Sequence, residues 1–153
     1  WSISIEPVIQ FIFCVNVTHT PGIYTISIHD SFQFYQTRCV KILYRLESEG
    51  LEPNIVIWAL IREWEQLWKL KLAQQTNAPI QWQKFGIWRN RQGFYQSAIN
   101  RLSLQQLEDI QSALTRADHA FKQNVIARPY IELCHLCMMF MGIDLRAVPL
   151  LEA

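Results

Sequence analysis

The pattern of apolar and polar residues predicts a helical chain after an irregular start. Residues 1–30 contain a stretch that suits a short helix and a β-branched run at 23–28 that alternates like a strand. We expect this part to be irregular or to hold a short helix. From a cap at Asp30 or Ser31, apolar side chains recur every three or four residues, which predicts a helix that ends at Gly50.

A second, longer helix is predicted to begin at Glu52-Pro53, because proline and an acidic residue suit the N-terminus of a helix. It should run to about Gln75. Its first half, residues 55–61, is apolar on every side, so we expect it to lie at the centre of the fold. Its second half is amphipathic, with Glu63 on the polar side.

Three more helices follow in the sequence. Residues 88–102 carry apolar side chains at helical spacing. Ser103 and Gln106 match a capping box, in which each side chain bonds the other residue's backbone N–H, and this predicts a helix start. The last helix is expected from about Pro129 to Gly142. The sequence therefore predicts an all-α fold, a single bundle of about five to six helices.

Composition agrees with a folded domain. The chain has 153 residues, of which 50% are hydrophobic and 18% charged, so it can bury a core without a metal or disulfide and is no disordered tail. A protein that held nucleic acid mainly by neutralising phosphates would be more basic than this net charge of +1.

The longest purely apolar run, 55–61, is too short to cross a bilayer, and nothing resembles a secretory signal. We expect a cytoplasmic protein without membrane contact. Because the chain begins at Trp1 rather than methionine, we interpret it as a fragment of a longer protein or a processed chain.

The segment Cys134-His135-Leu136-Cys137 contains CxxC, which suggests a metal or redox site. Structural zinc needs four ligands, usually from two such pairs, and the sequence has no second pair. We therefore favour core thiols one helical turn apart and keep a thiol or metal enzyme as the weaker alternative. The chain also lacks the phosphate-binding motif Gly-x-x-x-x-Gly-Lys-Ser/Thr. No catalytic residue, metal or cofactor is assigned.

Several short motifs occur in a fixed order from about Asp30 onward. They are Leu43-Tyr44-Arg45-Leu46, Glu49-Gly50-Leu51-Glu52-Pro53, Arg62-Glu63 with Leu67, Trp88-Arg89-Asn90-Arg91, Ala98-Ile99-Asn100-Arg101-Leu102-Ser103, and the spaced set Leu107, Leu114, Ala117, Asp118 and Lys122. In this order and spacing, the motifs resemble the C-terminal domain of the delta subunit family of bacterial DNA polymerase III clamp loaders. The family-motif residues are Glu52, Pro53, Arg101, Leu102, Ser103, Ala117, Asp118 and Lys122. Gln123 stands where many members of the family have glycine.

The resemblance implies a role as well as a fold. Residues 31–153 would form a helical collar domain, and residues 1–30 the end of a preceding domain or a linker arm. In the family, the collar joins delta to the gamma or tau subunits and to delta-prime in a pentameric ring that supports clamp loading in DNA replication. The sliding clamp is gripped by an N-terminal domain missing here, and primed DNA is met only indirectly. Delta itself neither binds nor hydrolyses ATP, so the resemblance implies a non-catalytic subunit.

The helix over 88–102 carries the candidate interface, because it mixes aromatic residues with arginines. We expect four of its side chains to lie partly exposed and to contact a neighbouring subunit: Trp88, Arg91, Tyr95 and Arg101. The alternative is a general protein-interaction or nucleic-acid-binding helical module. In the latter, the phosphate contacts would come from Arg89, Arg91, Arg101 and Lys122.

Overall fold

A computed structural model describes the backbone of residues 28–142 and the side chains of residues 37–142. This part of the chain is helical and contains no strand. Its elements are α2 (Ile28–Ser48), α3 (Pro53–Gln75), the short 3-10 helix η2 (Trp82–Phe85), α4 (Arg89–Arg101), α5 (Leu104–Lys122) and α6 (Pro129–Phe140). The all-α prediction is confirmed. The elements expected before Ile28 lie outside the described residues. The domain boundary near residue 30 stays a prediction.

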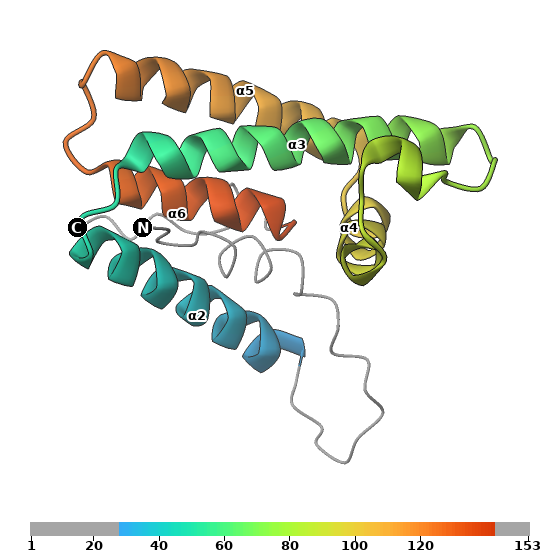
Figure 1. Cartoon of the computed structure of the whole chain (residues 1–153). Coiled ribbons are helices and arrows are strands. Elements are labelled where there is room, and N and C mark those ends of the chain that lie inside the picture. Colours follow the sequence, from blue (N-terminus) through green and yellow to red (C-terminus); the bar gives the residue numbers. More distant parts are fainter. Residues whose placement is uncertain (1–27, 143–153) are drawn as a thin grey trace.

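The helices form a layered bundle around α3. Figure 1 shows α3 beside α5 and α6, with α2 on the far side of α6 and α4 crossing near the C-terminal end of α3. The helix neighbours are therefore α3 with α4, α5 and α6, and α6 with α2 and α5. No helix of residues 28–142 is long and apolar enough to span a bilayer.

The helix ends form where the local chemistry predicts them. Pro53 occupies the first turn of α3, after an extended Glu52. At the start of α5, the backbone N–H of Gln106 donates to the Ser103 hydroxyl oxygen at 3.1 Å. The Ser103 N–H donates to Gln106 Oε1 at 2.9 Å, which completes the predicted capping box.

Two helices end in the same left-handed turn with different residues. After α2, Gly50 has φ +79°, and the N–H of Leu51 donates to the Leu46 carbonyl at 3.1 Å. After α5, Asn124 has φ 55°, and the N–H of Val125 donates to the Ala120 carbonyl at 3.2 Å. Asparagine tolerates this conformation better than other non-glycine residues. Asn124 thus supplies the turn, and Gln123 keeps a right-handed backbone before it.

One hydrophobic core joins all five α-helices. Every helix contributes a stripe of buried apolar residues, and the largest fully buried side chains are Phe140, Leu43, Ile57, Leu60, Leu67, Leu70, Ile99, Leu102, Leu107 and Ile110. Three side chains of α3 also donate to backbone carbonyls of its neighbours. Trp64 Nε1 bonds the Leu107 carbonyl at 2.7 Å, Lys71 Nζ the Ile99 carbonyl at 2.6 Å, and Gln66 Nε2 the Phe85 carbonyl at 2.9 Å.

The first half of α3 is less central than the sequence predicted. Val56, Ile57 and Leu60 are buried, but Ile55 is 46% exposed and Trp58 is 65% exposed. The expectation that this segment lies at the centre of the fold is therefore wrong for these two residues. The physical reason is that α5 and α6 cover only part of the circumference of α3 at this end.

Candidate subunit-binding surface

Trp88 is the most exposed large hydrophobic side chain among the described residues. It is 79% exposed and precedes the first turn of α4, where its carbonyl accepts the Arg91 N–H at 2.9 Å. The sequence predicted at least partial exposure for Trp88, and this is confirmed. An exposed indole ring is typical of a surface that a partner covers, so Trp88 stays the leading candidate for an interface contact.

Tyr95 does not belong to the exposed surface. It is only 3% exposed, and its hydroxyl donates to the Glu63 carboxylate of α3. The expectation of partial exposure is wrong for Tyr95, because α4 crosses α3 and packs the face with Ala98 and Ile99 against it. The spacing of Tyr95, Ala98, Ile99 and Leu102 is that of a buried helical stripe, and this signal identifies the packed face.

Arg91 and Arg101 are partly buried and bind groups within the chain. Arg91 Nη2 lies 3.5 Å from Glu63 Oε1, and its guanidinium lies over the Tyr95 ring at 5.5 Å from the centroid. Arg101 Nη2 donates to the Phe140 carbonyl at 2.9 Å, and burial lowers the pKa of Arg101 to about 10. These contacts fix the two arginines to α3 and to the end of α6. Their expected contact with a neighbouring subunit stays a prediction.

Glu63 is buried, although the sequence pattern predicted it on the polar side of its helix. It is 6% exposed and is the buried charged residue of the described core. It sits in the middle of the buried stripe of Val56, Leu60, Leu67 and Leu70, at intervals of three and four residues. A buried carboxylate needs hydrogen-bond donors, and Tyr95 and Arg91 supply them.

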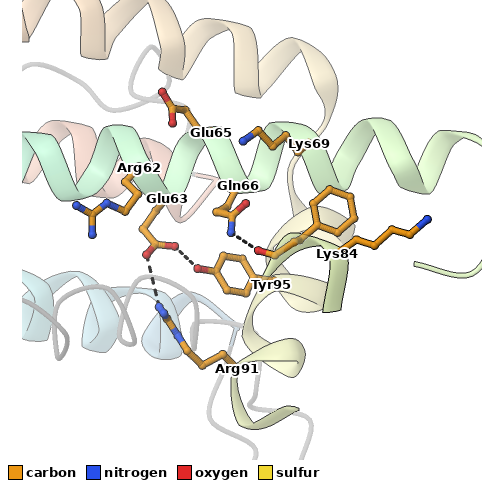
Figure 2. A pocket seen from close by; sticks show the side chains of 9 residues that line it. Arg62, Glu63, Glu65, Gln66, Lys69, Lys84, Arg91 and Tyr95 are labelled. Carbon is orange, nitrogen blue, oxygen red and sulfur yellow. Dashed lines mark hydrogen bonds and ion pairs between the residues drawn. The ribbon is translucent and has the colours of Figure 1, made fainter. Parts of the chain in front are cut away.

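A groove of about 500 Å³ opens beside this polar cluster, which we call the α3–α4 groove. Figure 2 shows Glu63 bonded to both Tyr95 and Arg91, with basic side chains of α3 and η2 around them. The groove is lined by Arg62, Glu63, Glu65, Gln66, Lys69, Lys84, Phe85, Arg91 and Tyr95.

The cysteines of the CxxC segment lie where α6 meets α2. Cys137 is fully buried and hydrogen-bonded to Cys39, while Cys134 is partly buried. The hydrogen bond to Cys39, together with burial, raises the pKa of Cys137 well above its ordinary value, and burial raises the pKa of Cys134 to about 11. A thiolate is the nucleophilic form, so both sites favour the inert thiol. The core-thiol interpretation is confirmed for Cys137, and among the described side chains no three metal-binding residues cluster.

Comparison with known proteins places the chain in a family. A family model described as the processivity clamp loader gamma complex DNA pol III C-terminal domain matches residues 30–147. The chain belongs to this family. Membership supports a role in DNA replication.

DNA polymerase III subunit delta of Escherichia coli is 36% identical over 104 residues, which are 67% of this chain and 30% of that protein. The delta subunit of Haemophilus influenzae is 32% identical over 109 residues, 65% of this chain and 32% of that protein. The chain thus spans about a third of the length of these curated relatives.

The family-motif residues hold the fold together in this chain. Glu52 and Pro53 start α3, and Ser103 caps α5. Leu102 and Ala117 are buried, Arg101 bonds α6, and Lys122 Nζ pairs with Asp118 at 2.7 Å, as their spacing predicts. Three of the four cations proposed to contact phosphates already have partners inside the chain, which weakens the nucleic-acid alternative. They are Arg91, Arg101 and Lys122.

Proposed function

We propose that this chain is the C-terminal part of a delta subunit and joins delta to the gamma or tau subunits and to delta-prime in the collar of a clamp loader. The observation that carries the proposal is the family match over residues 30–147, which spans almost all of the described helical bundle. In this role the chain performs no chemistry. It holds its neighbours in order in the cytoplasm. Contact with the sliding clamp belongs to an N-terminal domain of delta outside these 153 residues, and primed DNA is met only indirectly.

The physical properties of the bundle support a docking role. Its helices are fixed by caps, by a shared core and by side-chain bonds from α3 to three neighbouring backbones. Rigid elements lose little freedom when they bind, which favours association. Large apolar side chains nevertheless remain at the surface. They are Val40, Tyr44, Ile55, Trp58, Leu72, Trp88, Val125 and Ile131.

Co-elution with candidate partners tests the proposal. The 153-residue chain should co-elute in gel filtration with gamma or tau and delta-prime together, because the collar contacts suffice for assembly. The sliding clamp is the negative control, since in this proposal its binding belongs to an N-terminal domain outside these 153 residues. Failure to join the other subunits, or equal binding to the clamp, would contradict the proposed function.

A further inference from the structure

Three cations on the rim of the α3–α4 groove have no partner within the described residues. Arg62, Lys69 and Lys84 are exposed, and they make no hydrogen bond or ion pair with any described group. Several other cations of the same part of the chain are engaged, whereas the remaining ones without such contacts, Lys41, Arg89, Arg116 and Arg128, do not line the groove. Lys71 bonds the Ile99 carbonyl, and Lys122 pairs with Asp118. The groove therefore gathers positive charge that the fold itself does not use.

The carboxylates of the groove do not cancel this charge. Its lining holds four cations, the three above and Arg91, against two carboxylates, Glu63 and Glu65, which leaves a formal charge of +2. The whole chain carries only +1. Glu63 is also occupied, because Tyr95 and Arg91 already bond it. Positive charge is thus concentrated in the groove, where a concave surface strengthens the attraction of an anion.

We propose that the α3–α4 groove binds an acidic segment of another protein. Cations of the rim would pair with spaced carboxylates, while Gln66 and the partly buried Phe85 offer a polar and an apolar contact to the intervening residues. A nucleic-acid backbone fits less well, because its closely spaced phosphates would meet Glu65 within the same lining. The inference goes beyond the proposed function, since it does not require that the acidic partner be a clamp-loader subunit.

Fluorescence anisotropy on the 153-residue chain tests this binding. The probe is a labelled peptide of alternating Glu and Leu residues, and the same peptide with Gln for Glu is the neutral control. The double variant Lys69→Glu, Lys84→Glu should bind the acidic peptide about tenfold more weakly. Its matched control is Lys41→Glu, Arg116→Glu, which makes the same charge change at exposed positions outside the groove. Circular dichroism should show all variants folded.

The proposal predicts that the groove variant loses affinity and that the matched control keeps most of it. Three results would overturn it. The first is no binding of the acidic peptide in excess over the neutral one. The second is an equal loss in both variants, which would mean that only the net charge matters. The third is tighter, groove-dependent binding of a labelled oligothymidylate, which would assign the groove to nucleic acid.

Discussion

Two helix junctions bury ionisable groups in this molecule, and they stabilise opposite protonation states. At the α3–α4 junction, Glu63 receives a hydroxyl and a guanidinium, which stabilise the carboxylate. At the α2–α6 junction, Cys137 and Cys134 have mainly each other, Cys39 and apolar surroundings, which raise their pKa values and stabilise the neutral thiol. Burial alone therefore does not indicate function.

The difference separates the proposed binding groove from a structural contact between helices. The charged junction lies beside the groove and its unpartnered cations, whereas the thiol junction belongs to the hydrophobic core cluster. In our proposal the α3–α4 junction serves recognition, and the α2–α6 junction serves the stability of the core. Four predictions test this assignment, ordered by their expected effect on stability.

The largest loss of stability is expected in the core around α6, the helix that carries Cys134 and Cys137. Phe140 of α6 is 1% exposed, so Phe140→Ala leaves a cavity and should lower the free energy of unfolding by about 3–5 kcal/mol. Urea unfolding measures the change. Ile131→Ala, on the same helix but 45% exposed, is the control and should cost less than about 1 kcal/mol. Equal costs would mean that α6 is not packed as described.

A smaller but still clear loss of stability is expected at the α3–α4 junction. Glu63→Ala leaves the Tyr95 hydroxyl and the Arg91 guanidinium without their acceptor, so the free energy of unfolding should fall by about 2–3 kcal/mol. Glu65→Ala, two residues away and exposed, should stay within about 0.5 kcal/mol of the parent chain. If both variants unfold at the same urea concentration, Glu63 is not held by these contacts.

The thiol junction should make the chain sensitive to alkaline pH. The pKa of Cys134 rises from 9.0 to about 11 on folding, so its contribution to stability is complete below pH 9 and is lost as the pH rises towards 11. Burial also raises the pKa of Tyr130 to about 12, which matters only above its ordinary value of 10. Urea unfolding between pH 9 and 10 should therefore show a decline that is smaller in Cys134→Ala. A decline of the same size in that variant would contradict the assignment.

The smallest effect on stability is expected at the exposed indole. Trp88→Ala should change the free energy of unfolding by no more than about 0.5 kcal/mol, because the side chain is 79% exposed. The same variant should weaken co-elution with the partner subunits, since aromatic side chains often dominate binding energy. Tyr44→Ala is the comparison variant for stability and co-elution, because Tyr44 is also an exposed aromatic residue but lies on α2. Unchanged co-elution of Trp88→Ala would remove Trp88 from the proposed interface.

Local chemistry made most of the fold predictable. Pro53, the Ser103–Gln106 pair and Gly50 set helix ends through backbone contacts within a few residues, which a sequence shows directly. The buried stripe of α5, from Leu107 to Phe121, also has the spacing of three and four residues that is typical of a packed helix face.

The candidate site was harder to predict, because it depends on which helices cross. Glu63 looks like a surface residue until α4 places Tyr95 and Arg91 against it. Trp58 looks like a core residue until the bundle leaves one side of α3 uncovered. Spacing along one helix determines a face, but it does not determine what packs on that face.

The bonds from α3 to its neighbours have a consequence for sequence divergence. Trp64, Lys71 and Gln66 bond main-chain carbonyls at positions 107, 99 and 85, and every amino acid offers that acceptor. Substitutions at the accepting positions therefore leave these bonds available, and only the donors on α3 must keep their identity. For these three bonds the requirement for a particular side chain therefore falls on α3, while α4, α5 and η2 contribute main-chain atoms and keep their own buried side chains for packing.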